Sequence, residues 1–317
     1  MKTLRLLLAL VTTLVCASQA HAQTYPAKSV RLVVGFGTGG GTDTLSRVLS
    51  RKLADTWPQS LVVENRPGAD GSIATEIVAK SPADGYTLVM VSNAHTITPF
   101  QRKLAYDPVK DFSPVSLIGS NPQLLLLHPS LPAKTLKELT ALAKSRPNEM
   151  AFASSGTGTS PYLAMELLKS VTGMKLTHVP YKGSGPAVID LIGGHVQLMF
   201  GAVSTTISHL QNGRLRAIAI SSPQRWPALP QIPTVAESGV PGFEASTWYG
   251  VLAPAGTPQA IVSKLHVDMV AAITAQDIRK HLLDLGISTI ASTPREFIDV
   301  IRNDMARWGK LIRSLEK

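Results

Sequence analysis

The stretch RLVVGFGTGGGTDTLSRVLSRKLADTW, from Arg31 to Trp57, contains an apolar run, a glycine-rich loop and an amphipathic segment in direct succession. The apolar run Val30–Val34 predicts a buried strand, and the apolar residues that recur at helical spacing after the loop predict a helix. A glycine-rich loop between a strand and a helix brings backbone N–H groups and a helix N-terminus close to an anion. The stretch therefore predicts an α/β fold with an anion-binding loop.

The loop Gly35-Phe36-Gly37-Thr38-Gly39-Gly40 is also a literal G-x-G-x-x-G, so NAD binding is one interpretation. That interpretation needs an acidic residue at the end of the second strand to bind the ribose. Glu64 ends the next predicted strand, but it lies 29 residues beyond Gly35, which is far for this fingerprint. An NAD-binding protein stays as an alternative, and no cofactor is expected.

The N-terminus has the three parts of a secretory signal peptide. Lys2 and Arg5 are basic, Leu6–Val15 is apolar, and Ala20-His21-Ala22 is a small-residue cleavage site. The apolar run is shorter than the about 18 residues of a membrane-spanning helix. We therefore expect residues 1–22 to be removed and the mature protein to be exported, away from the cytosolic NAD pool.

Cysteine and charge exclude several classes of protein. Cys16 is the only cysteine and lies inside the signal segment, so the mature chain has no thiol for a disulfide or a thiolate-bound metal. Without Lys2 and Arg5, 29 basic residues stand against 21 acidic ones, a net charge of +8. Because these charges are dispersed and form no basic run, no nucleic-acid partner is expected.

Strand-like and helix-like segments alternate along the chain in two successive units, which predicts parallel sheets with right-handed crossovers. In the first unit we expect strands at Val30–Val34, Leu61–Glu64 and Tyr86–Val91, and a helix at Ser72–Lys80 with Ile73, Ile77 and Val78 inward. In the second we expect strands at Leu124–Leu127, Met150–Ala153, Thr177–Val179, Val196–Phe200 and Leu215–Ile220, and helices at Thr135–Ser145, Ala187–Ile192 and Thr205–Gln211. A further helix after Ser160 should bury Leu163, Leu167, Leu168 and Val171, while a strand at Trp248–Ala253 and helices from Pro258 close the chain.

Each unit has a loop of small residues between a strand and a helix, at Gly35–Thr42 and at Ser154–Ser160. In open parallel sheets, ligands bind outside the carboxyl ends of the strands. Two such loops facing each other predict a cleft lined by backbone N–H groups and helix N-termini. Such a cleft suits a carboxylate or a phosphate without any basic side chain.

The chain has no Walker sequence, no H-E-x-x-H and no G-x-S-x-G. Its histidines are scattered, without metal-ligand spacing, so no metal site is expected. Ser154 and Ser155 precede a helix, where serine is usually a cap or part of an amide loop. No catalytic residue is therefore expected, although an exported hydrolase that uses Ser155 stays as an alternative.

Phe36, Gly39-Gly40 and Asp43 form a Phe-x-x-Gly-Gly-x-x-Asp pattern near the start of the mature chain. Further stretches follow in order: VVENRPGADG (62–71), DGYTL (84–88), YDPVKDFSPV (106–115), SSGTGTS (154–160), HVPYKGSGPAVIDLIGG (178–194), LPQIPTVAESGVPGF (229–243) and APAGTP (253–258). Together they resemble the tripartite tricarboxylate transporter receptors, also called Bug-type periplasmic solute-binding proteins. The resemblance covers nearly the whole mature chain.

The resemblance implies a type II periplasmic-binding-protein fold, in which two α/β lobes close on a ligand in the cleft between them. It implies a periplasmic, non-catalytic, monomeric receptor that delivers a small carboxylate to the membrane subunits of a tripartite tricarboxylate transporter. The ligand classes that the resemblance implies are di- and tricarboxylates, amino acids and aromatic acids. With crossings expected near Val115–Leu124 and between Ser221 and Ala253, the lobes become residues 23–122 with 246–317, and residues 123–245.

Carried onto this chain, the family's carboxylate site implicates both loops and a third wall after the third strand. The first loop contributes Gly39, Gly40 and Asp43, and the second loop contributes Ser154, Ser155, Gly158, Thr159 and Ser160. The third wall is the loop Ser92–Thr96, with Ser92 and Asn93 as its expected site residues. The chain departs from the family at Gly35, Gly37 and Thr38, where prolines are usual, so a wider pocket that includes Gly37 is expected. It also has Pro161-Tyr162 where a histidine is common, and Tyr162 is expected to stack on or hydrogen-bond the ligand.

Overall fold

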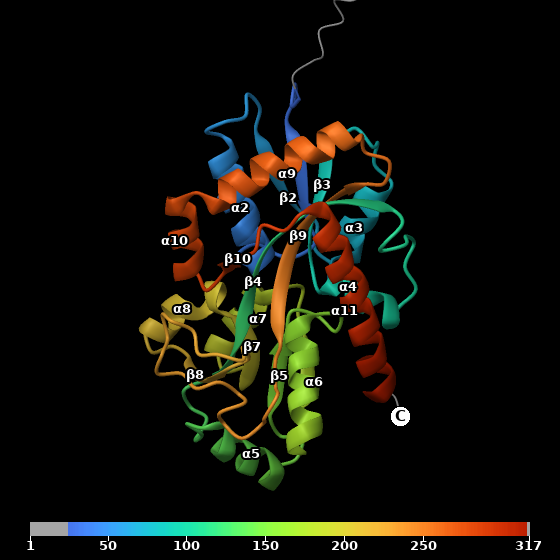
Figure 1. The fold of residues 1–317 in the computed structure, drawn as a ribbon. Coiled ribbons are helices and arrows are strands. Elements are labelled where there is room, and N and C mark those ends of the chain that lie inside the picture. Colours follow the sequence, from blue (N-terminus) through green and yellow to red (C-terminus); the bar gives the residue numbers. More distant parts are fainter. Residues whose placement is uncertain (1–24, 316–317) are drawn as a thin grey trace, which may run out of the picture.

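Strands β4 (Phe112–Leu127) and β9 (Ser246–Pro254) connect the two lobes of the molecule. In the computed structural model, which describes residues 25–315, these strands pair antiparallel along the whole of β9. The far end of β4 then pairs with β7 (Leu198–Ala202) and β8 (Arg216–Ile220). Figure 1 shows both long strands running between the upper and the lower lobe. The expected signal peptide, residues 1–22, lies outside the described residues.

The first lobe, at the top of Figure 1, is built around a parallel sheet. Strand β1 (Val30–Val34) lies between β2 (Leu61–Asn65) and β3 (Thr87–Ser92), and β9 pairs antiparallel with β3. Its other elements are α2 (Gly41–Leu53), α3 (Ser72–Ala79), α4 (Ala94–Ile97), α9 (Gln259–Thr274), α10 (Gln276–Asp284), the short β10 (Ser288–Thr289) and α11 (Pro294–Leu315). Apolar residues of β1, α2 and α9 share one buried core, so early and late parts of the chain fold together.

The second lobe repeats the pattern. Strand β5 (Ala151–Ser154) pairs parallel with β6 (Thr177–Pro180) on one side and β7 on the other. Its helices are α5 (Leu136–Ser145), α6 (Ser160–Thr172), α7 (Ser184–Ile192) and α8 (Val203–Gln211). The parallel pairing expected within each unit is found among β1, β2 and β3 and among β5, β6 and β7. It is wrong for the expected strands at Leu124–Leu127 and Leu215–Ile220, because β4 pairs antiparallel with β7 and β8. Strand β1 has the predicted bounds.

The crossing strand β4 is longer than expected. The sequence predicted a strand over Leu124–Leu127 and a crossing between the lobes near Val115–Leu124, whereas β4 is one continuous strand from Phe112. In the structure Pro114 lies at a register irregularity, and Pro122 is opposite the first residue of β9. Pairing with two neighbours therefore extends the strand past both prolines.

The sequence predicted the buried faces of helices α3 and α6 only in part. Ile73 and Ile77 of α3 are 46% and 36% exposed, and Val171 of α6 is 60% exposed. Val78 of α3 is buried as predicted, and Ala74 is buried with it against the sheet. Helical spacing does not distinguish between neighbouring apolar stripes, and the small Ala74 lets the backbone approach the sheet closely.

The C-terminal helix α11, which the sequence analysis assigned to the first lobe with residues 246–317, also contacts the second lobe. Trp308 and Ile312 of α11 pack with Ile97 of α4 and with Leu163 of α6. Gly309 permits this approach, because a Cβ there would lie 2.6 Å from the ring of Phe100. Helix α11 thus forms an apolar support across one side of the lobe junction.

Candidate ligand-binding cavity

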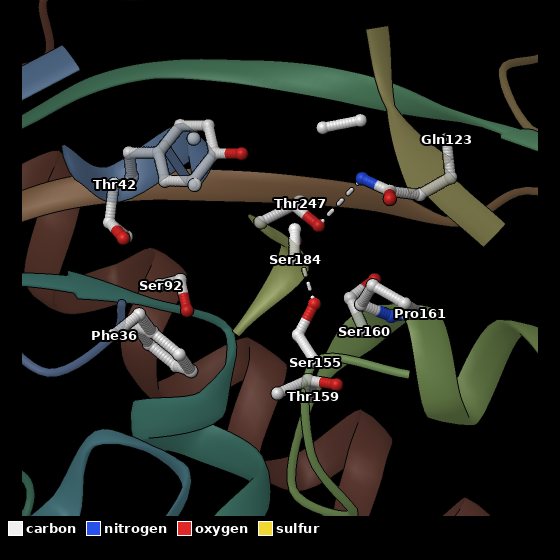
Figure 2. A pocket seen from close by; sticks show the side chains of 14 residues that line it. Phe36, Thr42, Ser92, Gln123, Ser155, Thr159, Ser160, Pro161, Ser184 and Thr247 are labelled. Atoms are coloured by element: carbon white, nitrogen blue, oxygen red, sulfur yellow. Dashed lines mark hydrogen bonds between the residues drawn. The ribbon is translucent and has the colours of Figure 1, made fainter. Parts of the chain in front are cut away.

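A cavity lies between the lobes, where both glycine- and serine-rich loops meet the crossing strands (Figure 2). Its walls come from the starts of helices and from β4 and β9. The lining residues are Phe36, Gly40, Gly41, Thr42, Ser92, Gln123, Ser155, Thr159, Ser160, Pro161, Ser184, Ala202, Thr247 and Tyr249.

Four helices begin at this cavity. Lining residues include the first turn of α2 at Gly41, of α6 at Ser160 and of α7 at Ser184, and the N-cap residue of α8, Ala202. Each helix N-terminus carries about half a positive elementary charge on N–H groups without an intrahelical partner. The lining contains no ionised side chain, so these helix N-termini determine the electrostatic potential of the cavity. That potential is positive and suits an anion.

The first-lobe loop is held by Asp43. Its carboxylate accepts hydrogen bonds from the backbone N–H of Gly39 (3.0 Å), from Arg47 Nε (3.0 Å to Oδ2) and from Asn65 Nδ2 (3.0 Å). Asn65 Nδ2 also donates to the carbonyl oxygen of Phe36. Gly39 has a φ of +78°, which glycine adopts without strain. These contacts fix the loop backbone in front of α2.

The same contacts keep Asp43 charged. Burial alone would raise the pKa of this carboxyl, but the hydrogen bonds from Arg47, Gly39 and Asn65 outweigh burial and lower its pKa below the ordinary value. Asp43 is buried and does not line the cavity. Its charge therefore serves the loop rather than a ligand.

The second-lobe loop is held by neutral hydroxyls. Ser154 Oγ accepts from the backbone N–H of Gly156 (3.1 Å) and lies 2.7 Å from His178 Nε2. Thr159 Oγ1 donates to the carbonyl oxygen of Gly156 at 2.6 Å. Gly156 itself has a φ of +134°, where other residues are strained. No ionised group takes part in these contacts.

The hydroxyl groups at the cavity differ in whether they can donate to a ligand. Thr159 and Ser160 already donate, to the backbone carbonyls of Gly156 and Ser246. Ser155 Oγ and Ser184 Oγ lie 2.7 Å apart, joined by a dashed line in Figure 2. A pair of hydroxyls uses one proton for its mutual bond, so the second proton is available to an anion.

The crossing strands provide a wall that the sequence did not indicate. Tyr249 Oη donates to Asn121 Oδ1 (3.0 Å), and Gln123 Nε2 donates to Thr247 Oγ1 (2.8 Å). Burial raises the pKa of Tyr249, so its hydroxyl keeps the proton that it donates. Gly41 packs directly on this hydroxyl, and a Cβ there would collide with it. The tyrosine thus ties α2 to β4.

The lobes touch each other around the cavity. The backbone N–H of Gly37 donates to the carbonyl oxygen of Lys182 (3.2 Å), and Gln101 Nε2 donates to that of Thr157 (2.8 Å). Thr157 Oγ1 also lies 3.3 Å from Asp70 Oδ2. These hydrogen bonds join the two lobes around the cavity.

The structure brings five of the predicted site residues to the cavity and places seven elsewhere. Gly40, Ser92, Ser155, Thr159 and Ser160 line it, whereas Gly37, Gly39, Asp43, Asn93, Ser154, Gly158 and Tyr162 do not. Sequence reasoning missed Gln123, Ser184, Thr247 and Tyr249 as site residues. Ser184 lies in the motif HVPYKGSGPAV, which could have indicated it, but nothing local marks the other three.

Tyr162 turns toward the second-lobe core rather than the cavity. Its ring centroid lies 4.7 Å from that of His178 and 6.5 Å from that of Phe152. Burial, followed by the positive charge of Lys169, lowers the pKa of His178 to about 4. Asn93 lies behind the wall, where its Oδ1 accepts from the backbone N–H of Trp248 (2.8 Å).

The geometry gives little support to the two alternatives. Ser155 is paired with Ser184, and the histidine nearest to this loop, His178, bonds Ser154, which is fully buried. Glu64, the residue that NAD binding would need, is bonded by Arg31 and Arg66, whose hydrogen bonds lower its pKa. Within residues 25–315, no three metal-ligating side chains cluster.

The profile of the family described as "Tripartite tricarboxylate transporter family receptor" matches residues 45–316. The chain belongs to this receptor family. It is 37% identical to the protein BugT of Bordetella pertussis, over 96% of this chain and 94% of that protein. The interpretation drawn from the sequence motifs is thereby confirmed.

Solved structures of relatives agree with the fold. The R. palustris protein Rpa4515 with adipate is 37% identical, has a TM-score of 0.89, and aligns over 91% of this chain and 97% of that one. MatC from Rhodopseudomonas palustris with bound malate is 34% identical with a TM-score of 0.87, over 91% of this chain and all of that one. The two-lobed periplasmic-binding-protein fold is confirmed. Within residues 25–315, no helix is both long and apolar enough to cross a bilayer.

Proposed function

We propose that this receptor captures a small carboxylate in the cavity between its lobes and delivers it to a tripartite tricarboxylate-type membrane transporter. The observation that carries the proposal is the meeting of four helix N-termini at a cavity whose lining has no ionised side chain. A carboxylate has acceptors only, so it complements N–H groups and hydroxyl protons. Relatives with adipate and with malate support the same ligand class.

Binding is proposed to use backbone N–H groups and hydroxyls from both lobes at once. The first lobe offers the start of α2 at Gly40–Thr42 together with Ser92, and the second offers the starts of α6 and α7 with the Ser155–Ser184 pair. A ligand that bonds both lobes favours the closed cleft over the open one, because only the closed state makes both sets of bonds. Closure then signals occupancy to the transporter.

We further propose that the lobes are residues 23–122 with 246–317, and residues 123–245. The antiparallel stretch of β4 and β9 supports these boundaries, because the chain passes between the lobes along it. Removal of residues 1–22 and release into the periplasm as a monomer belong to the same proposal. Transporter subunits are its expected macromolecular partner.

The receptor is proposed to act without catalysis. Ser155, the nucleophile that a hydrolase would need, is bonded by another serine rather than by a base. A serine without a general base is a weak nucleophile at neutral pH. Capture and release therefore account for the cavity without a chemical step.

A thermal-shift screen of the mature protein against small carboxylates tests the function. A ligand at 100 times its dissociation constant stabilises the folded protein by about 2.7 kcal/mol. Such a stabilisation raises the unfolding temperature measurably. No shift with any carboxylate, combined with a shift with NAD, would overturn the proposal in favour of dinucleotide binding. Turnover of an ester that disappears in Ser155→Ala would favour the hydrolase.

A further inference from the structure

The second-lobe loop Ser154–Ser160 faces the ligand cavity with only some of its residues. Ser155 and Thr159 line the cavity, whereas the three residues between them, 156–158, do not. In Figure 2, Ser155 and Thr159 lie across the cavity from the green crossing strand β4. The middle of the loop is therefore free to serve a purpose other than ligand contact.

A second cavity between the lobes shows where these middle residues lie. Among residues 25–315, it shares only Phe36 and Ser155 with the ligand cavity, and its other lining residues include Asp70, Gly156 and Thr157. None of its lining residues comes from β4 or β9. The contacts around Asp70 thus lie beyond the ligand cavity, away from the strands that connect the lobes. They must break if the lobes separate about those strands.

The first lobe meets the loop with the turn Ala69–Gly71. Ala69 and Asp70 have φ values of +48° and +57°, a left-handed conformation that costs free energy in residues other than glycine. The Asp70 side chain is only 7% exposed and lies against the loop, so that a Cβ on Gly156 would collide with its Oδ1. Arg102 Nη2 donates to Asp70 Oδ2 at 2.6 Å and compensates the buried charge within the same lobe.

Gly158 fits against the first lobe because it has no side chain. A Cβ at this position would lie 2.5 Å from Thr98 Oγ1 and 3.0 Å from Asp70 Cβ. Two hydrogen bonds accompany this packing. Gln101 Nε2 donates to the carbonyl oxygen of Thr157 at 2.8 Å, and Thr157 Oγ1 donates to Asp70 Oδ2 at 3.3 Å. Gly158, expected at the ligand from the family resemblance, instead packs between the lobes.

We infer that Asp70, Thr98 and Gln101 form a dock for loop residues 156–158, and that this dock, outside the ligand cavity, determines how tightly the receptor holds its carboxylate. The inference rests on the proposed carboxylate-binding function. When the loop is docked, Ser155 and Thr159 complete the cavity. Contacts that are made only in the binding-competent state raise the apparent affinity, because they increase the population of that state.

Gly158→Ala tests the dock. The φ of Gly158 lies outside the left-handed region, so alanine is not strained there, and the three atoms nearest to the new Cβ all belong to the first lobe. Calorimetric titration with succinate, malate and adipate should show affinities lower by at least about tenfold than in the wild type. The factor should be the same for every acid that binds, because the dock does not touch the ligand.

Thr98→Ala distinguishes an effect on the dock from an effect within the loop. Within residues 25–315, Thr98 Oγ1 has no hydrogen-bond partner, so this change alone should alter the affinities by less than about threefold. In the double variant Gly158→Ala/Thr98→Ala, the atom closest to the new methyl group is absent, and at least about threefold of the lost affinity should return. Recovery should be incomplete, because Asp70 Cβ remains close.

If Gly158→Ala fails to fold by circular dichroism, Gln101→Leu replaces it. This variant removes the donor to the Thr157 carbonyl and does not alter the ligand cavity, because Gln101 does not line it. All affinities should then fall by a common factor of about three or more. Unequal factors, or no loss, would overturn the inference.

The outcomes separate this inference from the function beneath it. Unchanged affinity in Gly158→Ala would overturn the dock, and so would a loss that differs between acids or that Thr98→Ala does not relieve. In each case the carboxylate function stands. If none of the three acids binds the wild type, the proposed function fails. Small-angle scattering of the ligand-free proteins then tests the dock alone: Gly158→Ala should have the larger radius of gyration, and equal radii would overturn the inference too.

Discussion

The two loops at the cavity perform the same task by different means. The first-lobe loop depends on one ionised side chain, Asp43, which accepts from three different residues. The second-lobe loop depends on the neutral hydroxyls of Ser154 and Thr159, which bond the backbone around Gly156. Both leave a helix N-terminus facing the cavity. A loop that is held by one charged residue depends on that residue for its stability. A loop that is held by several neutral hydrogen bonds depends less on any one of them.

Asp43→Ala should have the largest effect. It removes three bonds to a carboxylate and leaves the N–H of Gly39 without its acceptor, so we expect a loss of about 3 kcal/mol in the free energy of unfolding and no detectable carboxylate binding. Urea denaturation and calorimetry measure the two effects. Thr159→Val is the matched change in the other loop and should cost about 1 kcal/mol, because only one neutral bond is lost. Equal losses would show that both loops depend equally on a single residue.

Gly41→Ala should have the next largest effect, through the contact between α2 and the crossing strands. The new methyl group would displace the Tyr249 hydroxyl from Asn121, and overpacking of this kind costs about 2 kcal/mol, seen here as an affinity loss of at least about tenfold. Gly39→Ala is the control, since its φ of +78° is strained for alanine but no atom lies within 4 Å of the added Cβ. If both variants lose affinity equally, loop conformation rather than the tyrosine contact governs binding.

A smaller effect should appear in the pH dependence of the second-lobe loop. Burial, more than the charge of Lys169, lowers the folded-state pKa of His178 to about 4, below the about 6.5 expected when unfolded. The unfolded state therefore binds more protons between these values, and stability should fall as the pH drops from about 6.5 to 4. His178 is only partly buried, so its share is about 1 kcal/mol.

Thermal unfolding of the wild type and His178→Gln at several pH values isolates that share. His95, whose pKa burial also lowers to about 4, adds a similar slope from the first lobe in both proteins. The first-lobe loop itself should respond only at lower pH, because the pKa of Asp43 is lowered and its stabilisation is lost as the pH falls through that value. An unchanged slope in His178→Gln would contradict the assignment to His178.

Arg47→Ala should have the smallest effect. Its side chain is 47% exposed, and Asp43 keeps its bonds to Gly39 and Asn65 without it. Because Arg47 is half exposed and neither partner of this ion pair lines the cavity, the carboxylate affinity should change by less than about threefold in calorimetry. Loss of all binding in Arg47→Ala would mean that a side-chain ion pair holds the ligand and that the helix N-termini do not.

Much of the fold was predictable because its signals are local. The apolar run at Val30–Val34, the glycine loop after it and the small-residue loop at Ser154–Ser160 each specify backbone geometry within a few residues. The glycine- and serine-rich loops also predict an electropositive cleft from backbone geometry alone. The sequence motifs in and around these loops were sufficient to identify the receptor family.

The side chains that face the cavity were decided by tertiary structure. Tyr249 bonds Asn121 across 128 positions, and Gln123 bonds Thr247 across 124, so no local pattern marks these residues. Tyr162 was expected at the ligand, but packing turns it to the aromatic cluster around His178, and Asp43 bonds its own loop. The sequence by itself determined which segments form strands, helices and anion-binding loops, because backbone preference and apolar periodicity act over short distances. Only the tertiary structure decided which polar side chains share one cavity, because that depends on how distant strands pair and leave particular hydrogen-bonding groups unmet.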